Sequence, residues 1–232
     1  MPKPRPHKHH AHTPNRMTRS QAEPVQEADD ARQRILEKAL EKFTTLGYAK
    51  TTMDGIAAEL GMSKKTLYKY FATKLDLMEA LIQQNFDYLN DRCDAVLASS
   101  LSAIEKLTGI SQVIVDQQQR LATKVMMGSI RDHLPHIWRR IEAFRRERKK
   151  KNMQAVIEQG VREGSFRTDV DREMFDNFLS GSINEGIHPD VLIHAQYSMG
   201  DAFLGLMDIF MNGILTTTGR KQYKKVMAQK KM

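Results

Sequence analysis

Residues 51–74 read TTMDGIAAELGMSKKTLYKYFATK, and this stretch predicts two short helices joined by a tight turn. Thr51 and Asp54 have the spacing of a capping box, in which side chains bond the unpaired amides at a helix start. Gly61 can adopt the left-handed conformation that ends a helix, and Ser63 is a favourable N-cap for the next one. We therefore expect a helix-turn-helix whose second helix follows Ser63.

The second helix of this pair has an apolar face and a polar face. Leu67 and Phe71 are four residues apart and point inward together, as Ile56 and Leu60 do on the first helix. The outward side carries basic, hydroxyl and aromatic groups, namely Lys65, Thr66, Lys69 and, at the flank, Tyr68. Such a face suits the major groove of DNA, where it can meet both phosphates and base edges. The stretch therefore predicts binding to double-stranded DNA.

The order and spacing of these residues resemble the DNA-binding signature of TetR-type transcriptional repressors. The resemblance covers residues 29–87, including a first helix at 31–48, and continues more weakly over 160–171. The positions that carry the signature are Thr51, Thr52, Ile56, Ala57, Leu60, Gly61, Ser63, Leu67, Tyr68, Tyr70, Phe71 and Lys74.

The resemblance implies which residues touch the DNA. The recognition surface would consist of Ser63, Lys64, Lys65, Thr66, Tyr68, Lys69 and Tyr70. Lys74 would add a phosphate contact, and the hydroxyls of Thr51 and Thr52 would hold a phosphate at the start of the first helix. The family often has glycine at position 65, so the lysine here puts a charge where the backbone would otherwise approach. For an isolated basic helix, a solvated face would be the ordinary interpretation.

Composition limits the class of protein. The 232 residues suffice for one large domain or two small ones, and the net charge of +8 favours an anionic partner, with nucleic acid ahead of a membrane. The single cysteine, Cys93, excludes an intramolecular disulfide and fits a reducing cytoplasm. There is no run of about 18 apolar residues and no apolar segment behind the charged N-terminus. We expect a bacterial cytoplasmic protein with no membrane partner.

Helix signals follow one another and strand signals are almost absent, so the predicted fold is all-α. The expected helices span about 31–46, 73–99, 103–119, 122–132, 137–159, 171–185 and 193–217. Four regions follow: a disordered basic arm at 1–28, a helix-turn-helix domain at 29–89, a helical effector-binding and dimerisation domain at 90–220, and a basic tail at 221–232.

In TetR-like proteins the helical body encloses a small-molecule pocket, which implies a small apolar or amphipathic effector here. Candidate lining residues are apolar side chains of the expected body helices and the lone cysteine and tryptophan: Phe86, Leu89, Cys93, Met126, Met127, Ile130, Trp138, Phe178 and Ile183. Methionine suits an adaptable apolar pocket. Ordinary core packing is the alternative for each of them, because most apolar residues on a helical stripe simply pack.

The two last expected helices resemble the family's dimer pair. On the final helix, the stripe at spacings of three and four consists of Phe203, Leu206, Phe210 and Ile214. A stripe of this kind could also cover its own core, but recognition of two DNA half-sites needs two heads at a fixed separation. We therefore expect a homodimer that joins through this stripe.

The leading hypothesis is a homodimeric repressor that binds a palindromic operator and is released by an effector. The alternative is an effector-independent nucleoid-associated or structural DNA-binding protein of the same fold. No arrangement of residues typical of catalysis, of a bound metal or of another cofactor is found in the sequence, so we expect no enzyme. The clustered histidines His7, His9, His10 and His12 are a weak metal signal, since composition alone defines no ligand geometry.

Overall fold

The structure is a computed structural model that describes residues 19–121, 123–186 and 195–229. Within these ranges the regular structure is helical, apart from one isolated β-bridge between Phe166 and Leu215, as the all-α prediction requires. The helices are α1 (Arg19–Lys50), α2 (Met53–Glu59), α3 (Lys64–Tyr70), α4 (Lys74–Ala98), α5 (Ala103–Leu121), α6 (Lys124–His133), α7 (Pro135–Arg162), α8 (Arg172–Gly186), α10 (Met199–Ile214) and α11 (Thr217–Gln229). Among the described helices, none is long and apolar enough to cross a membrane.

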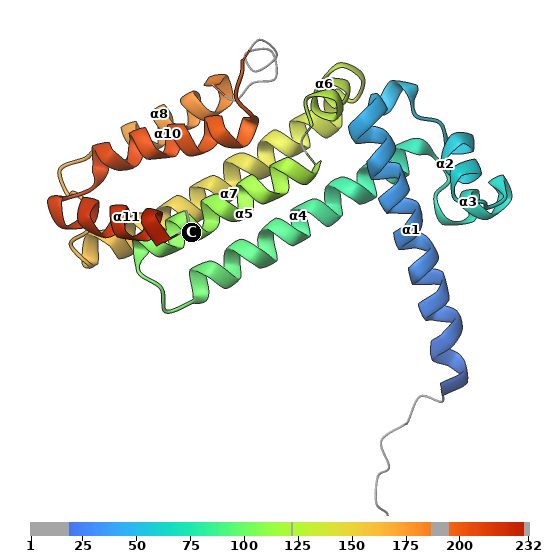
Figure 1. Cartoon of the computed structure of the whole chain (residues 1–232), viewed down its shortest axis with the longest axis horizontal. Helices are drawn as coiled ribbons and strands as arrows, with labels where there is room; N and C mark the ends of the chain where they lie inside the picture. Colours follow the sequence, from blue (N-terminus) through green and yellow to red (C-terminus); the bar gives the residue numbers. More distant parts are fainter. Residues whose placement is uncertain (1–18, 122, 187–194, 230–232) are drawn as a thin grey trace, which may run out of the picture.

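The chain forms a small headpiece and a larger helical body (Figure 1). Helices α2 and α3 lie beside α1 at one end, and α4 runs from this headpiece into the body. In the body, α5 is central because it packs against α4, α7, α10 and α11. Helices α8 and α10 lie side by side on the face away from α4, while α6 leans on α1. The body thus reaches the headpiece through two elements, α4 and α6.

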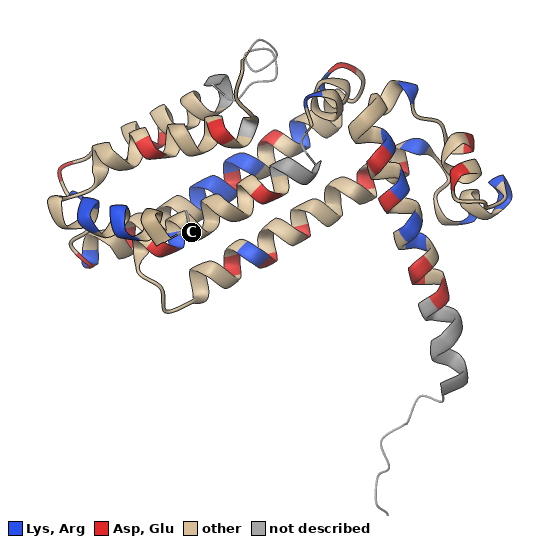
Figure 2. Cartoon of the chain, in the orientation of Figure 1, with Lys and Arg blue, Asp and Glu red and all other residues tan. Residues whose placement is uncertain are grey.

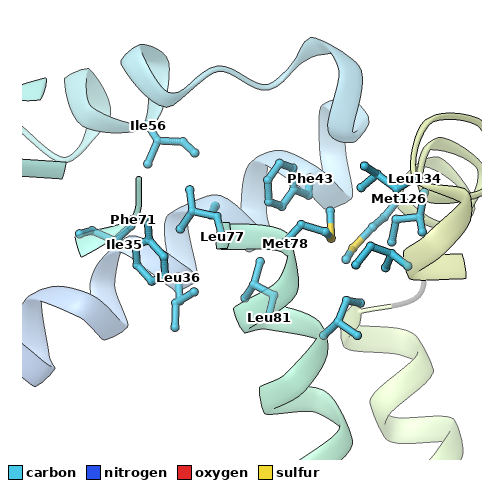
Figure 3. Packing of buried hydrophobic residues seen from close by; sticks show 14 of the residues in the cluster. Ile35, Leu36, Phe43, Ile56, Phe71, Leu77, Met78, Leu81, Met126 and Leu134 are labelled. Carbon is cyan, nitrogen blue, oxygen red and sulfur yellow. The ribbon is translucent and has the colours of Figure 1, made fainter. Parts of the chain in front are cut away.

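One apolar core joins the headpiece to α6 (Figure 3). From α1, Ile35, Leu36 and Phe43 point toward Ile56 of α2 and toward α4, and all four side chains are almost wholly buried. Each buried side chain of this size contributes roughly 1.5–3 kcal/mol to stability. Met126 of α6 enters the same core, so α6 belongs to the headpiece core as much as to the body.

The start of α1 differs from the prediction. Residues 19–28, expected within a disordered arm, continue the helix, and residues 1–18 lie outside the described residues. The prediction was wrong because it relied on an apolar period, which this segment lacks. Glutamine, alanine and glutamate favour a helix by propensity alone, and a helix already packed from residue 35 onward can be extended at little cost.

The end of the chain also differs. Of the predicted final helix, 193–217, only Met199–Ile214 is helical, as α10, because Leu215 leaves the helix to form the bridge with Phe166, and a separate helix, α11, begins at Thr217. The predicted basic tail, 221–232, is helical as far as Gln229, and Tyr223 is buried in the body core. The signal that was missed is the apolar spacing of Tyr223, Val226 and Met227, which charged residues surround.

Candidate nucleic-acid interface

The turn between α2 and α3 is built from local caps. Thr52, and not Thr51, is the N-cap of α2, and its Oγ1 accepts a hydrogen bond of 3.1 Å from the Gly55 amide. Gly61 has a φ of 63°, the left-handed conformation that the sequence predicted. Ser63 then caps α3, where its Oγ accepts a hydrogen bond of 3.0 Å from the Thr66 amide. These contacts fix the direction of α3.

Helix α3 buries one face and exposes the other, as expected. Leu67 is wholly buried in the headpiece core, while Lys65 and Lys69 are exposed and Tyr68 is 46% exposed. The basic residues of α3 stand out at the tip of the headpiece (Figure 2). Because the exposed side chains come from one short rigid helix, they form a single surface that can enter a groove.

Four other predicted contact residues in and beside α3 also interact within the protein. Lys64 forms an exposed ion pair of 2.6 Å with Asp54 of α2. The hydroxyls of Ser63 and Thr66 are hydrogen-bonded to each other at 2.8 Å. Tyr70 is half-buried, with its ring packed against the headpiece core. The exposed ion pair is weak and can open for a phosphate, whereas Tyr70 has only part of its ring available.

Two predicted phosphate contacts do not fit the geometry. Thr51 is 2% exposed, and its hydroxyl donates a hydrogen bond of 2.8 Å to the Gly47 carbonyl. Lys74 Nζ donates to the carbonyls of Tyr48 (2.7 Å) and Thr51 (2.8 Å) and lies 4.2 Å from the centre of the Tyr48 ring. Burial lowers the pKa of Lys74. Sequence spacing could not reveal this, because the carbonyls come from the end of α1, more than twenty residues earlier.

The end of α1 is held from the other side by α6. At Gly47 the helical backbone breaks, with a φ of 81°, and the amides that follow need new partners. Ser129 Oγ accepts hydrogen bonds from the amides of Tyr48 (2.8 Å) and Ala49 (3.4 Å). Thr123, the N-cap of α6, donates to the Thr44 carbonyl at 2.9 Å. The segment leading into α2 is therefore fixed by side chains of α4 and α6.

The structure does not bring the nine predicted pocket residues together. Five pack in the headpiece core or against it: Phe86, Met126, Met127, Ile130 and Trp138. Cys93 and Ile183 belong to a second core within the body, Leu89 is half-buried on α4, and Phe178 is 63% exposed on α8. The nine residues are divided between two cores because an apolar stripe does not reveal which neighbouring helix covers it.

The four residues of the predicted dimer stripe are not equally exposed. Phe203 and Ile214 are buried in the body core, while Leu206 and Phe210 are half-buried. The outer apolar face of α8 and α10 instead exposes four other large side chains: Met174, Phe178, Leu204 and Ile209. Helix α10 is apolar almost all round, so its periodicity selects no single face, and only the packing on α5 shows which side is left over.

A small cavity of about 70 Å³ lies between the end of α7, the loop before α8, and α10. Its lining includes Val161, Phe166, Phe175 and Ile214. Within the described ranges no group of three potential metal ligands occurs. Residues 1–18, with the clustered histidines, lie outside those ranges.

The segment that contains α2 and α3 is similar to known proteins. The family model of bacterial regulatory proteins of the tetR family matches residues 35–81, which span the end of α1 to the start of α4. An uncharacterised helix-turn-helix transcriptional regulator of Bacillus subtilis, YvaF, is 26% identical over 78% of this chain and 94% of its own. The transcriptional repressor KstR2 of Mycobacterium tuberculosis is 27% identical over 66% of this chain and 78% of its own.

Solved structures show the same fold. A TetR-family transcriptional regulator from Marinobacter aquaeolei superposes with a TM-score of 0.68 at 18% identity, over 86% of this chain and 97% of the other. The structure of KstR2 from Mycobacterium tuberculosis gives a TM-score of 0.56 at 22% identity, over 80% of this chain and 95% of the other.

Proposed function

The chain is a helix-turn-helix transcriptional regulator of the TetR family, and from that premise we propose that it is a homodimeric repressor released from a palindromic operator by a small-molecule effector. The observation that carries the DNA-binding part is the exposed face of α3, where Lys65, Tyr68 and Lys69 extend into solvent from a helix fixed by caps at its start. Lysines can meet phosphates or guanine edges, and tyrosine can bond a phosphate with its hydroxyl.

The homodimer is supported by the outer face of α8 and α10. Phe178 is 63% exposed and Ile209 is 71% exposed, although both are large apolar side chains on regular helices. Met174 and Leu204 are also exposed on the same two adjacent helices, and apolar side chains exposed in this number are typical of protein–protein contacts. A two-fold axis through this face would bring α8 and α10 of two copies into a four-helix arrangement. Two heads at a fixed separation could then read two half-sites.

Release by an effector requires a path from the body to α3, and the contacts of α6 support one. Ser129 and Thr123 of α6 hold the backbone of α1 near its end, while Lys74 of α4 holds the next residues. A shift of α6 or α4 would therefore move the segment that leads into α2. Such a shift changes the separation of two heads without unfolding either of them.

The experiment is operator titration with variants of α3. Lys65→Ala and Tyr68→Ala should each weaken binding to the DNA upstream of the protein's own gene by about 1–3 kcal/mol, the cost of one good contact. Both side chains are exposed, so circular dichroism should show an intact fold. Lys221→Ala, which removes the same charge from exposed α11, is the matched control and should bind as the wild type does.

Two results would contradict the proposal. Unchanged affinity in both α3 variants would place the recognition surface elsewhere. Equal losses in the α3 variants and in Lys221→Ala would indicate attraction by net charge alone, as in an architectural DNA-binding protein.

A further inference from the structure

Helix α7 holds α4 through a line of side chains along one of its faces. On α7, Arg140, Phe144 and Arg148 follow one another at spacings of four, so they lie on the same side of the helix. Their partners on α4 follow in the same order, from residue 83 to residue 94. The two helices therefore run in the same direction, from the headpiece into the body (Figure 1), and α7 contacts α4 at two levels.

The first level lies nearer the headpiece. Arg140 donates to the Gln83 side chain at 2.6 Å, and its guanidinium carbon lies 5.6 Å from the centre of the Phe86 ring. The Phe86 ring also stacks on Phe144, with 3.9 Å between the ring centres. This level joins α7 to the middle of α4.

The second level, toward the far end of α4, is centred on one buried arginine. Arg148 is 8% exposed, and its Nη2 donates to Asp94 Oδ1 at 2.6 Å and to the Asn90 carbonyl at 3.2 Å. Its side chain is also hydrogen-bonded to the buried thiol of Cys93, as is the side chain of Asn152 on α7. Because Asn90, Cys93 and Asp94 lie at spacings of three and four, Arg148 contacts a full turn of α4.

Two levels fix the tilt of α4, whereas one level would fix only its position and let it pivot. The apolar packing of α4 on α5 restrains tilt less, because hydrophobic contacts have no direction. Asn85 bonds to Gln117 of α5, but beside the first level, so this contact does not replace the second. From Asp94 back to Lys74 the helix is unbroken over roughly 30 Å. Its first turns belong to the headpiece core, so a change in tilt is passed to the headpiece.

We propose that Arg148 is a positioning residue for operator binding: from α7 it fixes the tilt of α4 and thereby the separation of the two heads. Lys151 of α7 also contacts Asp94, at 3.0 Å, but it is exposed, and exposed ion pairs are weak. The inference rests on the proposed function, since it presumes a dimer that reads two half-sites. It also implies that α4 and α7 move together, so an effector displaces the heads only by moving both helices.

The test compares a palindrome with one half-site. The probes are the operator from the DNA upstream of the protein's own gene and the same DNA cut to a single half-site. In Arg148→Met, the gain in affinity from the second half-site should fall about tenfold, because heads at a variable separation engage both half-sites less often. Affinity for the single half-site should stay unchanged, because α3 and its cap lie in the headpiece. Arg146→Met removes the same charge from an exposed position of α7 and should keep the full gain.

Stability distinguishes positioning from a purely structural role. Replacing a buried ion pair with an apolar side chain is often neutral or stabilising, and Asp94, whose side chain is 46% exposed, stays solvated in Arg148→Met. The melting temperature of this variant should therefore equal or exceed that of the wild type. Asp94→Asn is the second variant, because its amide oxygen can still accept from Arg148 but binds a guanidinium less firmly. Its gain from the second half-site should fall by a smaller factor.

The separation of the heads can also be measured directly. Ala58 is exposed on α2 and Cys93 is 1% exposed, so a spin label attached to Ala58→Cys reports on the headpiece alone. Pulsed electron paramagnetic resonance on the DNA-free dimer should show one narrow distance between the two labels. With Arg148→Met added, the distribution of distances should broaden.

The outcomes separate this inference from the proposed function. Equal gains in Arg148→Met and Arg146→Met, or equally narrow distance distributions, would show that Arg148 does not fix α4. An equal loss of affinity on the single half-site would mean that Arg148 supports the headpiece itself, and the positioning role would be wrong. A wild-type chain that gains nothing from the second half-site would overturn the proposed dimer and this inference together.

Discussion

Tyr223 shows how one side chain attaches the last helix to the body. Its ring is buried in the body core, and its hydroxyl lies beside Asp208 of α10. Burial, together with the carboxylate of Asp208, raises the pKa of Tyr223 to about 12. The protonated phenol is therefore favoured by the fold, and its loss at high pH must weaken the attachment of α11.

This gives a prediction on alkaline stability. An unfolded tyrosine titrates near pH 10, so between pH 10 and about 12 the folded chain keeps a proton that the unfolded chain has lost. The stabilisation is complete below pH 10 and disappears as pH rises through about 12. Urea midpoints across this range should fall more steeply for the wild type than for Tyr223→Phe. Parallel curves would contradict the assignment.

Lys74 shows in the headpiece, as Tyr223 does in the body, how one side chain attaches one helix to another segment. Its ammonium group takes the place of the missing helical amides at the end of α1, where the carbonyls of Tyr48 and Thr51 would otherwise be unpaired. A charged residue in a binding motif can therefore act entirely within the fold.

At the scale of elements, the contact between α1 and α6 is decisive. Gly47 permits the sharp exit from α1, and a Cβ atom there would also approach the Ser129 side chain to 3.2 Å. Gly47 thus lets the chain turn away from α1, and Ser129 of α6 binds the amides that follow. Because α6 also contributes Met126, Met127 and Ile130 to the headpiece core, the two elements should move as one unit.

Ser129→Ala tests this unit. The substitution removes the acceptor for the Tyr48 amide in a partly buried place, so the free energy of unfolding should fall by about 1–2 kcal/mol. Operator affinity should fall as well, since the segment leading into α2 loses a fixed position. Ser100→Ala, at an exposed serine after α4, is the control for urea denaturation and operator titration. If Ser129→Ala matches this control in both measurements, α6 does not position the headpiece.

At the scale of the whole molecule, the proposed dimer requires a surface that a second copy can cover. The outer face of α8 and α10 is far from α3 along the long axis of the chain (Figure 1), so a contact there could set the separation of two heads without obstructing them. The predicted stripe cannot act as a whole, because Phe203 and Ile214 are already used in the chain's own core.

Ile209→Glu tests the proposed dimer through a side chain that the chain's own core does not use. Ile209 is 71% exposed, so the substitution should leave the folded monomer intact, whereas in a dimer it buries two like charges against apolar surface at a cost of several kcal/mol. Sedimentation velocity at micromolar concentration should show a dimer for the wild type and a monomer for the variant. Leu101→Glu, on an exposed leucine in the loop after α4, should remain a dimer. A wild-type monomer that still binds its operator would overturn the dimer model.

The sequence by itself determined the helix-turn-helix, the all-α fold and the outward face of α3. These depend on local rules: a cap at Ser63, a left-handed glycine at 61, and a spacing that buries Leu67. Local rules act within one helical turn, so they can be read from neighbouring residues. At the start of α2 the predicted cap, Thr51, is one residue before the observed cap, Thr52. Both threonines are equally suited by type, but the Thr51 hydroxyl donates to the Gly47 carbonyl instead.

Only the tertiary structure decided what each apolar or charged side chain faces. Whether Lys74 meets a phosphate or a carbonyl, whether Met126 lines a pocket or packs on α1, and whether Ile209 is inside or outside depends on helices distant in sequence. Arg148 and Asn152 of α7 are a further example, since the sequence of a basic helix predicts solvated polar side chains, whereas both of these are buried in the packed body. Burial is a property of the packed helices, and no single helix contains it.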